Sequence, residues 1–342
     1  LFWLVALSYI LSRFLNGHVP DPLYRPLHAA GAYWLAAMVY FFLILLAVDL
    51  VRLADRLFGF LPSGAAAARF ALGTGSAIIL VVAGLLVYGA LNARRPVVTR
   101  YEISIDKELK GRGELLVALA SDIHLGALVN GRMLSRLVDE INALEPDVIL
   151  LAGDILDEDL GPFVERNMDA DLGRLRAPLG VYAVPGNHEY IGGSLDEFTG
   201  HLRAAGIDML KDRVVTPAGS FHIAGRDDRS AERFTGRKRM SLTELTSGLD
   251  PALPLIVMDH QPYGLDEAAA AGADLQVSGH THRGQFWPNS IVTGLVYELD
   301  YGLLKKGGTH FVVSSGYGTW GPPVRVGTRP EIVLIRDRKS VV

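Results

Sequence analysis

Long runs of apolar residues alternate with short polar stretches over the first 96 positions of the chain. Residues 71–91 contain no charged side chain, and a helix of that length, rising about 1.5 Å per residue, crosses a hydrocarbon layer of about 30 Å. Residues 31–51 are nearly as apolar, with Tyr33 and Trp34 near one end, where aromatic side chains favour the membrane interface. The pattern predicts a transmembrane helix in each of these two segments.

A third apolar segment, residues 1–15, is shorter and is interrupted by Arg13. Because the sequence begins with Leu1, a truncated start would make this segment the tail of a further span. Buried core helices are the alternative interpretation, but uncharged runs of about 18 or more residues are rare in soluble cores. A cleaved signal peptide would not account for successive apolar segments. We therefore predict a membrane region with two to three transmembrane helices over residues 1–96.

The basic residues that flank the spans give conflicting indications of orientation. The loop at 52–70 carries three arginines, whereas the loop at 16–32 carries only Arg25. Since basic loops stay in the cytoplasm, this count places the rest of the chain outside. Three arginines within residues 94–100 favour the opposite side. Large domains translocate despite flanking charge, so we expect an anchor in the inner membrane with the following domain on the extracytoplasmic side.

From residue 97 onward the pattern changes to short apolar runs separated by amphipathic stretches. A buried strand is predicted at 114–120, and a helix follows, because apolar residues recur every three or four positions over 133–144. Further strands are predicted at residues 147–151, 180–184, 253–258, 275–278, 311–314 and 331–335. Alternating strands and helices predict an α/β domain over residues 97–342, with functional groups on the loops that follow the strands.

The charge balance and the cysteine content exclude several classes of function. The chain has 33 basic and 37 acidic residues, a formal charge of −4, so it lacks the general basic character of a nucleic-acid-binding protein. It contains no cysteine, which excludes disulfides, thiolate metal ligands and a cysteine nucleophile. The Asp, Asn and His side chains of this sequence can supply oxygen and imidazole nitrogen ligands to a metal.

Five polar clusters lie at or near the ends of predicted strands. They are Asp122-Ile-His124, Gly153-Asp154 with Asp157, Gly186-Asn187-His188-Glu189, Asp259-His260-Gln261-Pro262 and Gly279-His280-Thr281-His282, and they hold five of the ten histidines. Residues two apart point to the same side of a strand, so each Asp-x-His or His-x-His pair directs two side chains together. A single cluster of this kind is usually a surface turn, but five in order predict a common site.

Together the clusters resemble the motifs of the calcineurin-like metallophosphoesterase superfamily. The superfamily pattern reads Asp-x-His, Gly-Asp-x-x-Asp, Gly-Asn-His-Asp/Glu, a lone His and Gly-His-x-His, and the resemblance covers about residues 100–336. Residues 177–182 and 328–332 are also similar to a membrane-linked bacterial branch. The resemblance implies a β-sandwich flanked by helices, hence an α/β fold preceded by a transmembrane helical region.

The resemblance further implies a site for two divalent metal ions. One ion would be held by Asp122, His124, Asp154 and His282, and the other by Asp154, Asn187, His260 and His280. Asp154 would be the bridge, because a carboxylate has two oxygens to share between two cations. These ligand types suit Mn²⁺, Fe²⁺ or Zn²⁺, with Mg²⁺ as an alternative.

The resemblance gives His188 a different role, in which it is not a metal ligand. It would protonate the leaving oxygen or stabilise the phosphate charge, and Glu189 or another acid would orient its ring. A water molecule between the two ions would attack phosphorus in line. We expect Asp157 to support the ligands rather than to coordinate an ion directly.

Two further features of the sequence are expected to be structural: the remaining histidines and a cluster of basic residues. The other histidines lack partners at ligand spacing, so we expect none of them to bind metal: His18, His28, His201, His222 and His310. Six basic residues lie within 226–239. We expect them to form a solvated loop, with an anion-binding clamp beside the site as the alternative.

These observations predict a membrane-anchored, metal-dependent phosphoesterase that hydrolyses a phosphomonoester or phosphodiester. The short distance in sequence between the last span and the domain favours a substrate linked to a lipid or to the cell envelope, and UDP-2,3-diacylglucosamine is the alternative that the superfamily suggests. A non-catalytic binding module on the same fold is a second alternative, but such a module should have lost a motif residue, and none is lost. The expected partners are a phosphate-ester substrate and the lipid bilayer, with no nucleic acid, and the sequence indicates no protein partner.

Overall fold

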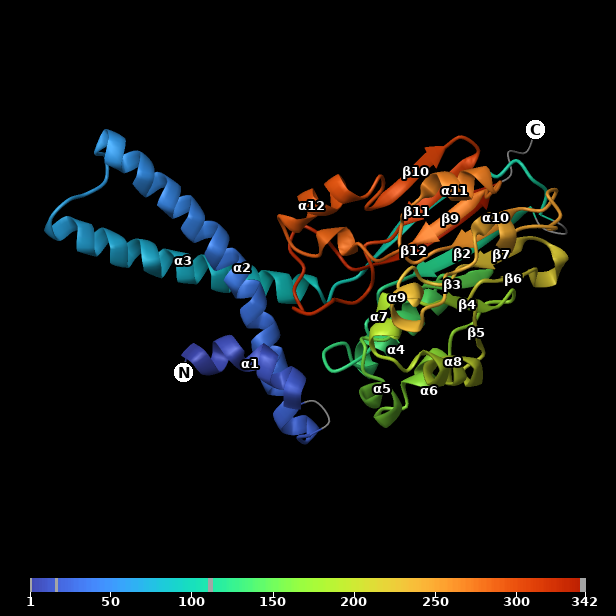
Figure 1. Cartoon of the computed structure of the whole chain (residues 1–342), viewed down its shortest axis with the longest axis horizontal. Coiled ribbons are helices and arrows are strands. Elements are labelled where there is room, and N and C mark those ends of the chain that lie inside the picture. The colour runs from blue at the N-terminus through green and yellow to red at the C-terminus, as the bar shows by residue number, and fades with distance from the viewer. Residues whose placement is uncertain (1, 16–17, 110–112, 339–342) are drawn as a thin grey trace. The chain divides into compact units, whose positions relative to one another are not determined.

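The computed structural model describes residues 2–15, 18–109 and 113–338. It divides the chain into two compact units (Figure 1). The first unit comprises Leu1–Ala93 with Gly321–Val326, and the second comprises Arg94–Trp320 with Gly327–Val342.

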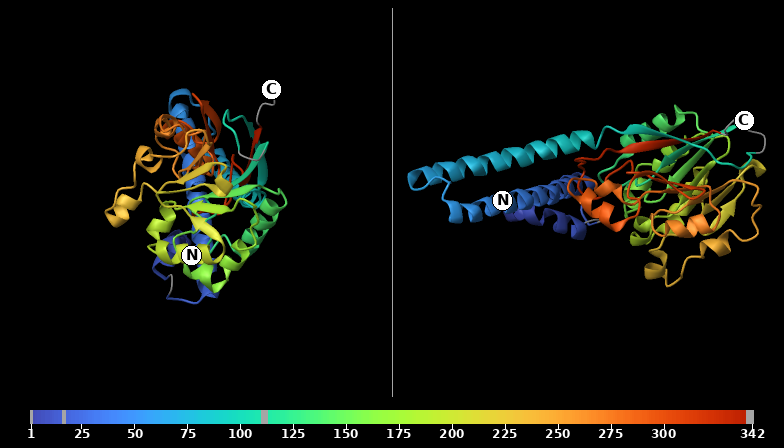
Figure 2. Two further views of the ribbon diagram at one scale, coloured as in Figure 1. Left: turned by 90° about the vertical axis from the view of Figure 1, so that its right-hand side faces the viewer. Right: turned by 90° about the horizontal axis from the view of Figure 1, so that it is seen from above.

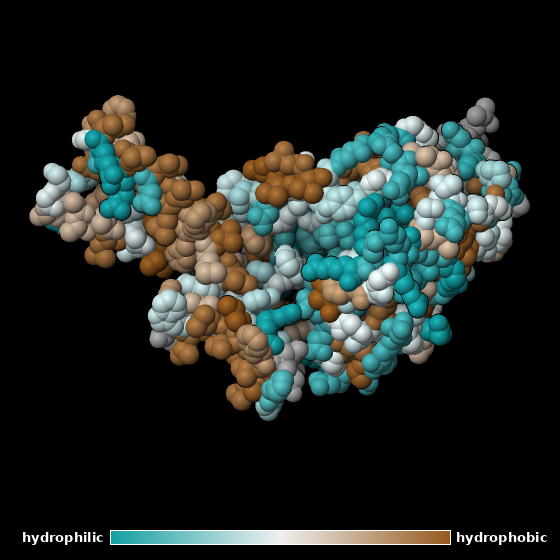
Figure 3. Space-filling model, in the orientation of Figure 1, coloured by the Kyte–Doolittle hydropathy of each residue, from teal (hydrophilic) through white to brown (hydrophobic). Residues whose placement is uncertain are grey.

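The first unit consists mainly of three helices: α1 (Phe2–Leu15), α2 (Asp21–Phe58) and α3 (Ala65–Asn92). Figure 2 shows α2 and α3 as two long helices, and their surfaces are mostly apolar (Figure 3). Both are long and apolar enough to cross a membrane, by length and composition, whereas α1 is shorter. A proline in the first turn favours the start of α2, and Gly59 ends it in the left-handed conformation, with φ 63°. The two predicted spans lie within α2 and α3.

A short segment from late in the sequence packs against the last turns of α3. The backbone N–H of Arg325 donates to the carbonyl of Gly89 (3.0 Å), and the side chain of Asn92 donates to the carbonyl of Arg325 (2.9 Å). A Cβ atom added at Gly89 would lie 3.0 Å from Val326 and 3.1 Å from Val324. The absence of a side chain at Gly89 therefore allows Gly321–Val326 to lie directly on the helix.

The second unit contains two six-stranded sheets. The first has the order β1 (Val97–Ile103), β12 (Glu331–Arg338), β2 (Glu114–Ala120), β3 (Val148–Ala152), β4 (Val181–Val184), β5 (Ile207–Met209). The second has the order β10 (Gly302–Lys306), β11 (Thr309–Val313), β9 (Leu275–Ser278), β8 (Leu255–Met258), β7 (His222–Gly225), β6 (Arg213–Val215). Strands β2 to β5 are parallel to one another, as are β7, β8, β9 and β11.

The remaining elements of this unit are short helices. They are α4 (Gly131–Asn142), α5 (Gly161–Glu165), α6 (Met168–Leu172), α7 (Asn187–Ile191), α8 (Leu195–Ala204), α9 (Ala231–Thr235), α10 (Leu242–Leu245), α11 (Leu265–Ala270) and α12 (Asn289–Val296), with the 3₁₀ turns η1 (Pro217–Gly219) and η2 (His282–Gly284). The α4 helix shows why they form where they do. The side chain of Asn130 accepts the backbone N–H of Arg132 (3.1 Å) and caps the helix, whose buried face includes Leu134 and Leu137.

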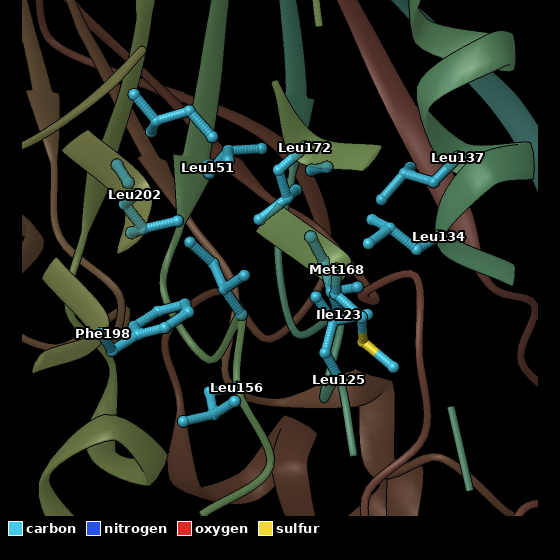
Figure 4. Packing of buried hydrophobic residues seen from close by; sticks show 14 of the residues in the cluster. Ile123, Leu125, Leu134, Leu137, Leu151, Leu156, Met168, Leu172, Phe198 and Leu202 are labelled. Atoms are coloured by element: carbon cyan, nitrogen blue, oxygen red, sulfur yellow. The ribbon is translucent and has the colours of Figure 1, made fainter. Parts of the chain in front are cut away.

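Apolar side chains fill the space between the two sheets and cover their outer faces. Val117 and Leu150 of the first sheet belong to one buried cluster with Ile223, Ile256 and Val277 of the second. A second cluster packs α4, α6 and α8 against the outer face of the first sheet (Figure 4). A third packs α10 and α11 against the outer face of the second sheet. The expected β-sandwich flanked by helices is therefore confirmed.

The expectation of a solvated loop over residues 226–239 is wrong for two of its arginines. The side chains of Arg226 and Arg239 are only 4% and 11% exposed. Both contact the carboxylate of Asp259, at 3.2 Å and 3.0 Å, and that side chain is 1% exposed. A buried carboxylate requires positive partners, and the two guanidinium groups provide them. The sequence alone did not predict these contacts, because it does not show which acidic residue lies beside each arginine.

We expect the Asp259→Asn variant to lose about 3 kcal/mol of stability, because Arg239 then loses its carboxylate partner and Arg226 keeps only that of Glu267, at 2.9 Å. The measurement is thermal unfolding of the full chain in detergent, followed by near-ultraviolet circular dichroism. Glu232→Gln is the matched control, since Glu232 pairs with Lys238 at the surface, where the side chains are 58% and 80% exposed, and its loss should change stability by less than about 0.5 kcal/mol. Equal shifts in the two variants would contradict the structural role of Asp259.

Candidate metal centre

The polar clusters of the sequence meet where strands of both sheets end. Asp122 and His124 follow β2, Asp154 follows β3 and Asn187 lies just after β4. In the second sheet, His260 follows β8, and His280 and His282 follow β9. Because these strands run parallel within each sheet, their carboxyl ends meet at one edge. The fold therefore brings all seven predicted ligands to one region.

The backbone turns sharply at most of these positions. Five of the seven candidate ligands have φ values in the left-handed region, between 49° and 71°: Asp122, His124, Asp154, His280 and His282. Such conformations cost about 1 kcal/mol or more for residues with a Cβ atom and concentrate at functional sites. The surrounding strands impose them and direct the side chains into the site.

Two motif glycines permit the close approach of the ligand loops. A Cβ atom at Gly279 would lie 2.2 Å from a carboxylate oxygen of Asp122. A Cβ atom at Gly186 would lie 2.2 Å from a carboxylate oxygen of Asp154. In both cases a side chain would displace the carboxylate. The glycine before each ligand is thus a packing requirement of the site.

The candidate ligands form two groups whose ligand atoms lie within 4.8 Å of one another. The first comprises Asp122, His124 and His282, and the second comprises Asp154, His260 and His280. Within the first, the Nε2 atoms of His124 and His282 are 3.0 Å apart. Two imidazole nitrogens at this distance with a carboxylate beside them form a suitable donor set for a divalent cation.

Asp154 lies between the two groups. Its Oδ2 atom is 3.1 Å from Nε2 of His260 and 4.0 Å from Nε2 of His124. Its other oxygen accepts the backbone N–H of His188 at 2.9 Å. One carboxylate therefore faces donors from both groups, which is the position that a bridging ligand would occupy.

Buried polar atoms without a hydrogen-bond partner lie in this region and test whether a cation fits. They include Oδ1 of Asn187 and Nδ1 of His124, whereas Nε2 of His260 has the carboxylate of Asp154 beside it at 3.1 Å. Buried polar atoms nearly always have partners, so their isolation indicates a missing ligand. Nδ1 of His260 lies 2.8 Å from the carbonyl of Ala152, and donation of its proton there leaves the lone pair on Nε2 free to bind metal. These residues fit a divalent ion.

His188 lies beside the first group and next to an acid other than the motif glutamate. Its Nδ1 atom is 3.4 Å from the carboxylate of Asp157. Burial lowers the pKa of His188, but Asp157, Asp154 and Glu158 outweigh burial and raise the pKa to about 9. The surrounding carboxylates therefore favour the protonated form of the His188 ring. The sequence left open whether Glu189 or another acid orients this ring, and the acid beside its Nδ1 atom is Asp157.

Glu189 binds backbone N–H groups, whereas the sequence had suggested that it orients the ring of His188. Its carboxylate accepts the backbone N–H groups of Gly186 (2.7 Å), Leu156 (2.9 Å) and Asp154 (3.1 Å). These bonds join the loop after β3 to the loop after β4. Glu189 therefore holds two ligand loops in register and does not face the ring of His188.

Asp157 also belongs to a third group of possible ligands, with His124 and His188. Of the other histidines, His201 pairs with Asp169 (3.1 Å) and His222 lies 2.9 Å from the hydroxyl of Thr216. Within the described part of the chain, no ligand group includes a histidine outside the five motifs.

Two aromatic residues beside the site were not predicted. The ring of Trp320 lies 6.3 Å from that of His188, and the ring of Tyr297 lies 6.2 Å from that of His280. They come from segments distant from the motifs, and no spacing in the sequence signals their position.

Comparison with known proteins shows which proteins this chain is similar to. A family model described as Calcineurin-like phosphoesterase matches residues 115–284. A bovine (Bos taurus) transmembrane protein with metallophosphoesterase domain is 35% identical over 272 residues, which are 75% of this chain and 61% of that protein. An uncharacterized metallophosphoesterase of Aquifex aeolicus is 32% identical over 243 residues, 70% of this chain and 90% of its own length. The solved structure of Haemophilus influenzae NAD nucleotidase is 16% identical with a TM-score of 0.39, covering 60% of this chain and 45% of that one.

We expect metal binding to weaken as the pH falls, because protons and metal compete for the same histidines. Burial lowers the pKa of His260, but the adjacent Asp154 carboxylate outweighs burial and holds that pKa well above its usual range. Since the protonated ring cannot bind metal, each displaced proton should lower the apparent Mn²⁺ affinity about tenfold per pH unit below the raised pKa.

The measurement is calorimetric titration of the metal-free full chain with Mn²⁺ in buffers of different ionisation enthalpy, which counts the protons released. His260→Gln should lower both the affinity and the proton count. His201→Gln, whose ring pairs with Asp169 outside the site, should change neither. An affinity independent of pH would show that these histidines do not bind the metal.

Proposed function

The chain belongs to the calcineurin-like phosphoesterase family, and on this premise we propose that it is a membrane-anchored hydrolase of phosphate esters that uses two divalent metal ions. Residues 1–96 would be the membrane region and residues 97–342 the catalytic domain. The observation that carries the proposal is the position of Asp154, with one oxygen facing histidines of both ligand groups. The chain spans 61% of the length of its bovine relative.

The proposed ligands follow the two groups of the site. One ion would be held by Asp122, His124, Asp154 and His282, and the other by Asp154, Asn187, His260 and His280. When bound, the ions would supply Lewis acidity to the phosphate oxygens and lower the pKa of an attacking water. The oxygen and nitrogen donors favour Mn²⁺, Fe²⁺ or Zn²⁺, with Mg²⁺ as an alternative.

His188 would act on the leaving group. Asp157 faces its Nδ1 atom, and the nearby carboxylates raise the pKa of the ring, which favours its protonated form. The ring would then donate its Nε2 proton to the leaving oxygen while the bond from phosphorus to that oxygen breaks and the bond from phosphorus to the water oxygen forms. Asp157 would keep the ring oriented and stabilise its charge before the transfer.

The substrate class follows from the anchor and is part of the proposal. A catalytic domain that begins a few residues after a span is held near lipid headgroups, which favours a phosphomonoester or phosphodiester linked to a lipid or to the envelope. The alternatives are the pyrophosphate of UDP-2,3-diacylglucosamine and a non-catalytic binding module. The complete set of motif residues and the buried, unpartnered Oδ1 of Asn187 favour an enzyme over a binding module.

We expect the purified full chain to contain about two divalent ions and to hydrolyse an aryl phosphomonoester or phosphodiester in the presence of Mn²⁺. A chelator should abolish this activity and added Mn²⁺ should restore it. Parallel assays with UDP-2,3-diacylglucosamine test the alternative substrate. Full activity in chelator, or a single bound ion with full activity, would contradict the two-metal proposal.

We expect substitutions at His188 and Asp154 to separate catalysis from metal binding. His188→Gln should lower kcat about 10²- to 10⁴-fold with the metal content unchanged, because the ring acts on the leaving oxygen. Asp154→Asn should lower the content of both ions, because its carboxylate faces both groups. Elemental analysis and initial rates provide the two readouts. Equal loss of metal in both variants would contradict this division of roles.

We propose the extracytoplasmic face of the inner membrane for the catalytic domain. The three arginines within residues 52–70 support this side, against one within residues 16–32. In cells whose outer envelope alone is permeabilised, added protease should then digest the domain. Protection until the inner membrane is broken would place the domain in the cytoplasm.

A further inference from the structure

The second unit has one concentrated apolar surface, on α12 and its flanks. Six large apolar side chains there are more than half exposed: Trp287 (56%), Ile291 (56%), Val292 (59%), Leu295 (83%), Val296 (54%) and Trp320 (57%). We call these six residues the α12 face, and apolar atoms mark this part of the molecule in Figure 3. Among the described residues of this unit, the other exposed large apolar side chains are 38–46% exposed: Val164, Ile191, Phe234 and Leu303.

The α12 helix is fixed to the second unit by its opposite side. The hydroxyl of Thr293 donates to the carboxylate of Asp300 at 2.6 Å. A Cβ atom added at Gly284 would lie 2.3 Å from the backbone nitrogen of Ser290, so the start of the helix packs directly on the loop after β9. The helix contains no charged residue. Its apolar face is therefore held outward by the fold, and a concentrated exposed patch of this kind marks an interaction site.

The α12 face adjoins the candidate metal centre through Trp320 and through Tyr297, the residue next to the helix. Tyr297 directly follows the helix, and its ring is 6.2 Å from that of His280. The ring of Trp320 is 6.3 Å from that of His188. The side-chain amide of Gln285 holds the backbone of Trp320 with two hydrogen bonds, of 2.8 and 2.9 Å. An apolar group bound on this face would thus have its polar end near the candidate ligands.

We propose that the α12 face rests on the lipid bilayer and guides the apolar chain of a lipid-like phosphate ester into the site. The proposal rests on the proposed function. It deepens that function with a surface that lies beyond the family match, which ends at residue 284. Uncharged helices with exposed aliphatic side chains and tryptophans at their edges are suited to lie in a membrane interface.

Chain connectivity favours the bilayer as the occupant. Four residues separate the end of α3 at Asn92 from the start of β1 at Val97, and they span at most about 14 Å. Trp320 immediately precedes Gly321–Val326, the segment that packs on the last turns of α3. The chain that carries the α12 face is therefore attached at both places to a helix long and apolar enough to cross a membrane.

A label on α12 tests the contact directly. Because the chain has no cysteine, Leu295→Cys carries a single environment-sensitive fluorophore, and Lys238→Cys, at a side chain 80% exposed, is the control on the same unit. Both full chains are placed in phosphatidylcholine–phosphatidylglycerol nanodiscs, one chain per disc, with and without nitroxide-bearing lipids. We expect quenching of the label at position 295 to exceed that at position 238 several-fold.

Equal quenching at the two positions would overturn the proposal. Energy transfer between labels at position 295, appearing only when two chains share a disc and without lipid quenching, would assign the face to a second copy and would overturn it as well.

A pair of matched valine variants tests the consequence for the substrate. Val292→Asp places a charge on the α12 face, whereas Val164→Asp places the same charge on a 40% exposed valine outside it. The two substrates are a water-soluble aryl phosphodiester and the same ester with a long alkyl chain in vesicles. Relative to the unmodified chain, Val292→Asp should lower the preference for the vesicle-borne ester about tenfold, and Val164→Asp should leave it unchanged.

The two assays separate the possible failures. If neither ester is hydrolysed by the unmodified chain, the proposed function fails, while the quenching result still decides whether the face contacts lipid. If both esters are hydrolysed and Val292→Asp leaves the preference unchanged, the role of the α12 face in guiding the substrate is overturned.

Discussion

A concentration of buried negative charge governs the arrangement of the second unit. The carboxylates of Asp122 and Asp154 are essentially inaccessible to solvent, and no arginine or lysine contacts either of them in the part of the chain that the structure describes. Burial of an isolated carboxylate is too costly to persist without a compensating charge. Imidazoles surround both, and Asp154 shows the consequence: burial would raise its pKa, but His260 and its neighbours hold the pKa well below the usual value. Either protons on these rings or bound cations must supply the positive charge, which explains why metal binding and pH should be linked.

The same requirement accounts for the strained backbone around the site. A cation needs donors from several directions within a few ångströms, whereas residues along one strand point alternately to two faces. Left-handed residues at the ends of β2, β3 and β9 turn the chain enough to bring Asp122, Asp154 and His280 together. The glycines before Asn187 and His280 then allow adjacent loops to approach the carboxylates more closely than any side chain would permit. Local strain at these turns is offset by the packed sheets that impose it.

The clustering of the candidate ligands was predictable from the sequence because they lie in short contiguous motifs at the ends of apolar runs. The same applies to strands such as β2 and β9, whose apolar runs have clear ends, and to the amphipathic helix α4. Strands β5 and β6, of three residues each, carry too little pattern to be recognised. The aromatic neighbours Tyr297 and Trp320 were also missed, since only the fold brings them beside the histidines. The motifs therefore locate the candidate ligands, whereas they do not reveal the aromatic residues that the fold places beside them.

Asp259 and His260 show how the fold separates two residues that the sequence places in one cluster. Neighbouring residues at a strand end point to opposite sides, so the ring of His260 faces Asp154 while the carboxylate of Asp259 faces Arg226 and Arg239. Guanidinium groups remain charged at any physiological pH and therefore keep their ion pair with the carboxylate. Imidazoles release their proton and can exchange it for a metal ion. The carboxylate of Asp259 is therefore held in a structural ion pair with its arginines. The carboxylate of Asp154 faces histidines and remains able to bind a metal ion.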